Sequence, residues 1–156
     1  EEKLIKAIGL GLNDAEVANK FITNEQFDCV LLAGRYTLLD TSAEDKFFST
    51  AIKKNVGIIL AGIFNSGILA KGLKQSTYFY KAIPAKTKKK FIEIDKLCRK
   101  FNIPIQAASI QFPLKNKYVS SIILGMDEIS QIKENLKYLN IKIDGEFWNN
   151  LKNIQK

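Results

Sequence analysis

The candidate ligand-binding residues of this chain lie around one glycine, which separates a strand-like segment from a helix-like segment. Residues 119–124 are mostly aliphatic and β-branched, Gly125 follows them, and residues 129–139 place aliphatic side chains at helical spacing. Gly125 would let the backbone approach a ligand closely, and the free N–H groups of the next helical turn favour an anion. The same turn also joins strand to helix in α/β proteins that bind nothing there, so the local pattern leaves both interpretations open.

The absence of histidine excludes a large share of enzyme chemistry. The 156 residues include no His, so the chain cannot activate a Ser or Cys nucleophile with imidazole or build a His-containing zinc site. The two cysteines, Cys29 and Cys98, lie in apolar segments without neighbouring metal-ligand residues. We expect both to be buried thiols in a reducing, cytoplasmic compartment, and we predict no metal site.

The charge pattern argues against nucleic acid and membrane as partners. The net charge is +8, but the lysines are spread along the chain, and the one dense run, residues 86–90, lies where a helix should begin. This run lacks the interleaved aromatic residues of a single-strand binding surface, so we expect a solvated helix start. No apolar run reaches 18 residues, and the first ten residues do not resemble a signal peptide.

Strand-like and helix-like segments alternate along the chain, which predicts βαβ units and a parallel sheet covered on both faces. Helix starts are indicated by Asn13–Asp14 as an N-cap and by residues 41–45 as a capping box. Val17 and Phe21 belong to the apolar spacing of the first helix. The expected strands cover residues 5–12, 29–33, 56–62 and 119–124.

Three further features have competing interpretations. Gly9 and Gly11 form a G-x-G pattern, but the third glycine of a dinucleotide motif is missing, so close packing in the sheet is the better explanation. The connection after residue 62 runs for about twenty residues before the next clear helix, and its aromatic residues 78–80 would either line a cleft or pack across the end of a barrel. Trp148 is predicted to be a packing anchor.

Four βα units in one domain, residues 1–156, fit two architectures. They can form an open doubly wound sheet, or they can be part of an eight-stranded barrel, which needs about 250 residues. The chain starts without Met on what looks like the end of a helix. We therefore expect a fragment, or a half-barrel that completes itself by pairing.

Five segments carry a family resemblance: IKAIGLGLN, FDCVLLAGRYTLLD, IILAGIFNSGILA, AASIQFPL and VSSIILGMDEISQIKENL. Together they resemble the aldo-keto reductases, in particular the branch of the D-threo-aldose 1-dehydrogenases. The most specific is LLAGRYTLLD followed by FNSGIL, and a G-x-x-x-x-x-Q-x-x-EN pattern is shared with the wider superfamily. The resemblance implies a TIM-type (β/α)8 barrel, of which this chain would be the carboxyl-terminal half with strands five to eight.

The resemblance implies NAD(P)-dependent interconversion of carbonyls and alcohols, with an Asp, Tyr, Lys and His set from the first half of the barrel. None of those four can be assigned to a residue here, so we predict no catalytic residue in this chain. We expect the cofactor-binding half of an oxidoreductase, inactive in isolation. The alternative is a non-catalytic half-barrel that self-associates through its strand edges.

The resemblance also implies two groups of cofactor-binding residues. The loop after strand seven would lie along the pyrophosphate, and the turn and helix after strand eight would hold the adenosine end. The first group is Gly62, Phe64, Asn65 and Ser66; the second is Gly125, Met126, Gln131, Glu134 and Asn135.

Some positions depart from the family pattern. Ala33 and Ala61 stand where relatives place a Gln and a Tyr beside the nicotinamide, and Asp127 stands where NADP users tend to have a basic residue. The Asp127 carboxylate would repel a 2′-phosphate, so we expect NAD rather than NADP. Asn13 and Tyr36 remain as candidate nicotinamide contacts. Whether the isolated chain binds cofactor, and whether its partner is an amino-terminal half or a second copy, stays open.

Overall fold

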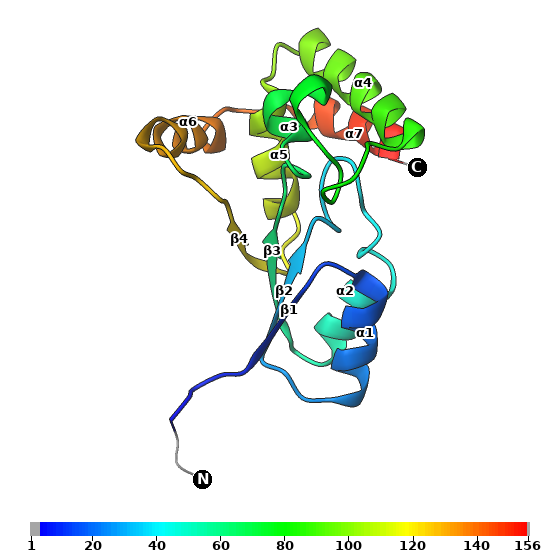
Figure 1. The fold of residues 1–156 in the computed structure, drawn as a ribbon, viewed down its shortest axis with the longest axis vertical. Helices are drawn as coiled ribbons and strands as arrows, with labels where there is room; N and C mark the ends of the chain where they lie inside the picture. Colours follow the sequence, from blue (N-terminus) through cyan, green and yellow to red (C-terminus); the bar gives the residue numbers. More distant parts are fainter. Residues whose placement is uncertain (1–3, 156) are drawn as a thin grey trace.

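The computed structural model describes residues 4–155, apart from the side chain of Gln75, as an alternation of strands and helices (Figure 1). The elements are β1 (Gly9–Leu12), α1 (Ala15–Asn24), β2 (Cys29–Ala33), α2 (Lys46–Lys53), β3 (Gly57–Ala61), α3 (Ile68–Lys71), the 3₁₀ turn η1 (Leu73–Gln75), α4 (Ala85–Lys100), α5 (Ile105–Leu114), β4 (Val119–Ile123), α6 (Ile129–Leu139) and α7 (Gly145–Gln155).

The four strands form one parallel sheet in the order β1-β2-β3-β4. Cys29 pairs with Gly9 on one side and Gly57 on the other, so the first three strands start level with one another. The α/β fold with four parallel strands is therefore confirmed. In the described part of the chain, the outer edges of β1 and β4 pair with no strand.

Helices cover only one face of this sheet, so the prediction of a sheet covered on both faces is wrong for the described residues. Val30, Leu32, Ile58 and Leu60 are at most 1% exposed and pack in one core with residues of α1 and α2. Residues between them, such as Ile59, are only half-buried because they point to the opposite face. In Figure 1, α1 and α2 lie together on one side of the sheet.

A second apolar core joins the helices beyond the carboxyl ends of the strands. It contains Ile68 of α3, Ile94 of α4, Ala108 of α5 and Phe147 of α7. Trp148 is 7% exposed in this core, which confirms it as a packing residue. This helical layer supports the loops that leave β2 and β3.

Of the two predicted helix starts, the structure confirms the first and contradicts the second. Asp14 caps α1 by accepting from the backbone N–H groups of Glu16 and Val17, both at 2.9 Å, as expected. The capping box at residues 41–45 is wrong, because α2 begins at Lys46 and its N-cap residue makes no side-chain bond. Asp40 instead accepts from the backbone and hydroxyl of Ser42, which holds that segment in turns.

The glycine pattern in β1 packs closely at only one position. A Cβ on Gly9 would lie 2.7 Å from the sulfur of Cys29, whereas a Cβ on Gly11 would meet nothing within 4 Å. Close packing is confirmed for the first glycine and is wrong for the second.

The connection after β3 contains structure that the sequence pattern did not predict. It forms α3 and η1, and a bridge between Tyr78 and Lys81 closes its end. Phe79 packs beneath the Arg35 guanidinium at 4.2 Å, and the Tyr78 hydroxyl donates to Asp40 at 3.0 Å. The packing interpretation therefore holds for these two aromatic side chains, while Tyr80 is 92% exposed.

Candidate cofactor site

The loop that leaves β3 makes an unusually tight turn. Gly62 has a φ of +60°, and a Cβ there would lie 3.3 Å from the backbone nitrogen of Gly34. The next positive φ values are +47° at Asn65, +54° at Ser66 and +95° at Gly67. Residues other than glycine rarely adopt positive φ values, although Asn does so more readily than most. The backbone path of this loop therefore depends on which residues occupy these positions.

The side chain of Asn65 lacks hydrogen-bond partners in its buried position. The residue is 3% exposed, and neither its amide nitrogen nor its carbonyl oxygen has a partner in the described structure. A buried amide without a partner destabilises a fold by about 1–3 kcal/mol. Most buried polar groups in folded proteins have a hydrogen-bond partner, so this amide is a candidate contact for a bound water, ion or ligand.

The turn that leaves β4 is organised by a pair of side chains. The backbone N–H of Asp127 donates to Oε1 of Gln131 at 3.1 Å, and Nε2 of Gln131 donates to Oδ1 of Asp127 at 2.6 Å. Glu128, the N-cap residue of α6, makes no side-chain cap bond. The turn therefore presents a fixed carboxylate beside the uncapped start of α6.

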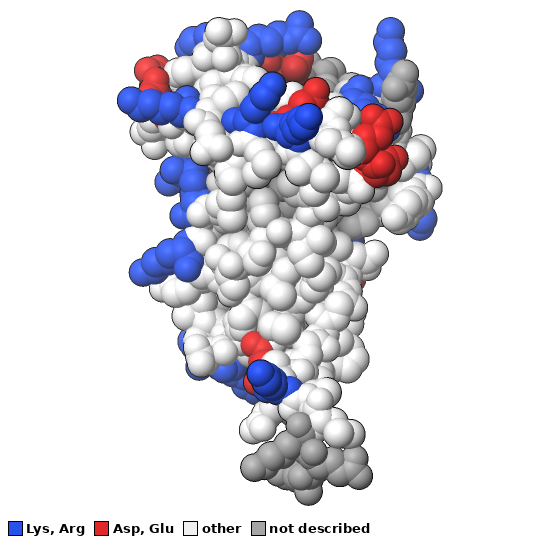
Figure 2. Space-filling model, turned by 90° about the vertical axis from the view of Figure 1, so that its left-hand side faces the viewer, with Lys and Arg blue, Asp and Glu red and all other residues white. Residues whose placement is uncertain are grey.

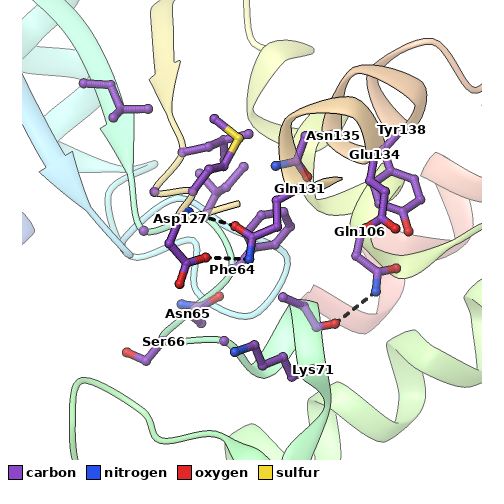
Figure 3. A pocket seen from close by; sticks show the side chains of 18 residues that line it. Phe64, Asn65, Ser66, Lys71, Gln106, Asp127, Gln131, Glu134, Asn135 and Tyr138 are labelled. Atoms are coloured by element: carbon purple, nitrogen blue, oxygen red, sulfur yellow. Dashed lines mark hydrogen bonds between the residues drawn. The ribbon is translucent and has the colours of Figure 1, made fainter. Parts of the chain in front are cut away.

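These two segments form opposite walls of a cavity of about 710 Å³. Figure 3 shows Gln131 reaching from α6 to Asp127, and Glu134 of the same helix pointing toward Gln106. The structure brings all nine predicted residues to this cavity, although they come from distant parts of the sequence. They are Gly62, Phe64, Asn65, Ser66, Gly125, Met126, Gln131, Glu134 and Asn135.

The sequence did not identify three other polar residues that line the cavity. Lys71, in the short helix α3, supplies a cationic side chain, and Tyr138 extends the α6 wall. Gln106 donates from Nε2 to the carbonyl oxygen of Ala70 at 3.0 Å, which ties α5 to α3 (Figure 3). No local pattern marks these residues, because they reach the cavity only through the packing of α3 and α5.

Tyr36 lies elsewhere, so its predicted contact with the nicotinamide is wrong. Its ring is 6% exposed and packs in the core between Phe48 and Phe112, at centroid distances of 4.8 and 5.0 Å. The backbone carbonyl of Asn13 accepts from Nε of Arg35 at 2.6 Å, which connects the exits of β1 and β2. The Asn13 side-chain contact stays a prediction.

Residues 4–155 contain neither a metal-binding cluster nor a membrane-spanning helix. No three or more Cys, Asp or Glu side chains gather there as metal ligands, and no helix in this range is both long and apolar enough to cross a membrane. Both cysteines are free; Cys98 is buried, but Cys29 is only half-buried, so the prediction of two buried thiols is wrong for Cys29.

Comparison with known proteins relates the whole chain to one family. The model of the Aldo/keto reductase family matches residues 2–156. A pyridoxal 4-dehydrogenase from Microbacterium luteolum is 37% identical over 150 residues, which are 95% of this chain and 44% of that protein. A D-threo-aldose 1-dehydrogenase from Pseudomonas sp. is 31% identical over 149 residues, 94% of this chain and 45% of the relative.

Solved structures agree with this relationship at the level of fold. An aldo-keto reductase from Bacillus halodurans superposes with a TM-score of 0.74 in both its apo and holo forms. The match covers 99% of this chain and 53% and 52% of those chains, at 17% and 18% identity. The chain spans less than half the length of the curated relatives it matches. This chain belongs to the aldo-keto reductase family.

Proposed function

We propose that residues 1–156 are one domain, the carboxyl-terminal half of an aldo-keto reductase barrel with strands five to eight, and that this half binds the nicotinamide dinucleotide. The observation that supports this most strongly is the cavity between the β3 and β4 exits, whose wall contains the unpartnered amide of Asn65. Ligands of parallel α/β sheets bind at the carboxyl ends of the strands, where this cavity lies.

The β3 exit loop is the proposed pyrophosphate wall. The amide nitrogen of Asn65 and the hydroxyl of Ser66 are hydrogen-bond donors suited to phosphate oxygens. Lys71 adds a positive charge to the same cavity. A dinucleotide lying along this wall would supply the acceptor that the buried Asn65 amide lacks.

The α6 wall is the proposed adenosine site. Glu134 can accept a hydrogen bond from the adenine amino group, and Asn135 can both donate and accept. Both side chains lie on the wall opposite Ser66 in Figure 3. Gly125 and Met126 border the same space, where the Met126 side chain offers an apolar contact.

We further propose that the site prefers NAD to NADP. The Asp127 carboxylate is held at the cavity by Gln131, and a carboxylate repels the 2′-phosphate that distinguishes NADP. The adenosine part of the site would therefore favour a ribose without a 2′-phosphate.

The isolated chain is proposed to be inactive in catalysis. Its relatives are named as dehydrogenases of pyridoxal and of D-threo-aldoses, so the complete protein would oxidise pyridoxal, an aldose or a related compound with an aldehyde carbon. The cofactor supplies hydride chemistry when bound, and the protein must supply a path for the accompanying proton. This chain contains no His, and the proton-transferring residues would come from another part of the barrel. The free cysteines support a reducing, cytoplasmic location.

Calorimetric titration of the chain with NAD and NADP tests the binding proposal. We expect saturable binding of NAD, weaker binding of NADP, and no reduction of NAD when L-fucose, D-arabinose or pyridoxal is added. A folded chain that binds neither dinucleotide would overturn the binding role. Enzyme-like turnover by the isolated chain would overturn the proposed inactivity.

A further inference from the structure

Lysines occur along the whole chain, but their excess over acidic residues lies in one segment, residues 71–100. The chain has 24 Lys and Arg residues and 16 Asp and Glu residues. This segment contains ten of the former and two of the latter, so the rest of the chain contains fourteen of each. The net charge of +8 is therefore the net charge of residues 71–100 alone.

Most of this positive charge faces solvent. Nine of the ten basic side chains are exposed, and Lys90 is half-buried. The segment runs from the end of α3 through η1 and α4, and Figure 1 shows α4 at the end of the molecule opposite α1. In Figure 2, which views the side of β4 and α6, Lys and Arg lie next to Asp and Glu at the upper end, so that side carries both signs of charge. The surplus of positive charge thus gathers on the surface of η1 and α4.

Both ends of this segment adjoin the candidate cofactor cavity. Lys71 lines the cavity, and Lys74 follows it by three residues, which span at most about 11 Å. At the other end, Lys100 precedes the lining residue Gln106 by six residues, which span at most about 20 Å. The helices α3 and α4 also contribute side chains to the same apolar core. The basic surface therefore begins at the cavity wall and returns to it.

The cavity lining itself does not attract an anion. Its charged side chains are Lys71, Asp127 and Glu134, so carboxylates outnumber ammonium groups. A nicotinamide dinucleotide carries two negative charges on its pyrophosphate, and like charges repel. Long-range attraction of this ligand must therefore come from charge outside the lining, and residues 71–100 hold the chain's surplus of positive charge.

We propose that residues 71–100 form an electropositive surface that attracts the pyrophosphate of the dinucleotide toward the cavity. Lys74 and Lys100 then raise the association rate without contacting the bound nucleotide. Charge of one sign around a cleft raises the association rate of a ligand of opposite charge. Charges at the rim act mainly on the association rate and its salt dependence. This inference rests on the proposed cofactor role, because the attracted ligand is the anionic dinucleotide.

Stopped-flow measurement of NADH binding, followed by the fluorescence of the nucleotide, tests the proposal. The double variant Lys74→Glu/Lys100→Glu lowers the charge beside the cavity by four units. In about 10 mM salt, where the Debye length is about 30 Å, it should lower the association rate constant about fourfold. The dissociation rate constant should stay within about twofold of wild type. In about 500 mM salt the two proteins should bind at nearly equal rates, because salt screens charges at these distances.

Lys20→Glu/Lys53→Glu is the matched control. It makes the same charge change at two exposed residues of α1 and α2 that do not line the cavity, and Lys53, like Lys100, lies in the last turn of its helix. It should leave the association rate nearly unchanged. Lys74→Gln/Lys100→Gln removes half as much charge and should lower the rate about twofold, which gives a graded response from a milder change. Circular dichroism should show that all variants keep the fold.

Three results would overturn the inference. The first is an association rate that is equal in the wild type and in both Lys74/Lys100 variants at low salt. The second is an equal decrease in the Lys20/Lys53 control, and the third is a change confined to the dissociation rate, which indicates direct contact. Absence of NADH binding to the folded wild-type chain would overturn the proposed cofactor role itself, so the two failures are distinguishable.

Discussion

The side chain of Gln131 makes two hydrogen bonds to Asp127: its carbonyl oxygen accepts from the backbone N–H, and its amide nitrogen donates to the carboxylate. This arrangement orients the exposed carboxylate of Asp127 at the wall of the candidate site. In the proposed cofactor site, Gln131 would act on the nucleotide through Asp127, as a positioning residue.

Asp127→Lys is expected to shift the nucleotide preference toward NADP. At about 4 Å, two unit charges interact by roughly 1 kcal/mol in water and about 4 kcal/mol at a protein surface, so reversing the charge should change the ratio of the NAD and NADP dissociation constants at least tenfold. Parallel titrations with both nucleotides measure this ratio. Asp144→Lys makes the same charge change at an exposed residue outside the cavity lining and should leave the ratio unchanged.

Asn65→Gly should weaken nucleotide binding and leave the free energy of unfolding nearly unchanged. Glycine adopts the φ of +47° without strain, and its introduction removes a buried amide that has no partner, so the free energy of unfolding should stay within about 1 kcal/mol of wild type. Loss of the amide's hydrogen bonds to the nucleotide should weaken binding about tenfold. The measurements are urea denaturation and calorimetry.

Asn102→Gly is the control for this change, because Asn102 has a similar φ of +53° but is exposed and does not line the cavity. It should leave nucleotide binding unaltered. If Asn65→Gly lowered the stability by several kcal/mol and left binding unchanged, the Asn65 side chain would have a structural role instead.

The Tyr78 hydroxyl should stay protonated in strongly alkaline solution. Burial, together with the neighbouring carboxylate of Asp40, raises the pKa of Tyr78 well above its usual value near 10. A raised pKa in the folded state means that this group's stabilisation is present below pH 10 and is lost as the pH rises above it. Stability should therefore fall more steeply above pH 10 in the wild type than in Tyr78→Phe.

Alkaline titration followed by tyrosinate absorbance, with unfolding measured at each pH, checks this expectation. Tyr80→Phe removes a hydroxyl from a side chain that is 92% exposed and should keep the wild-type slope. Equal slopes in Tyr78→Phe and the wild type would contradict the prediction.

Cys98 should resist alkylation in the folded protein. Burial, with a smaller contribution from Asp95, raises the pKa of this thiol to about 12, so almost no reactive thiolate exists at pH 8. We expect iodoacetamide to modify the half-buried Cys29 first and to reach Cys98 only after unfolding. Mass spectrometry of digests with and without urea measures both sites, and rapid modification of Cys98 without urea would contradict the expectation.

The sequence by itself determined the parallel direction of the strands and the general place of the site. Alternating strand and helix patterns imply parallel strands, and parallel strands bring their exits to one end of the sheet. The loop at Asn65 and the turn at Gly125 could therefore be predicted to lie near each other, and they line one cavity. Asp14 could be predicted as a cap because its bonds reach only two and three residues along the chain.

Only the tertiary structure decided which apolar and polar side chains have partners. Val17 and Val30 look equally suited to a core, yet one is exposed and the other buried, because periodicity does not show which face a neighbouring element covers. The lack of partners for Asn65 and the approach of Gln106 to Ala70 depend on contacts between segments far apart in sequence. Local residue patterns specify helices and strands, whereas burial and hydrogen-bond satisfaction are properties of the packed chain.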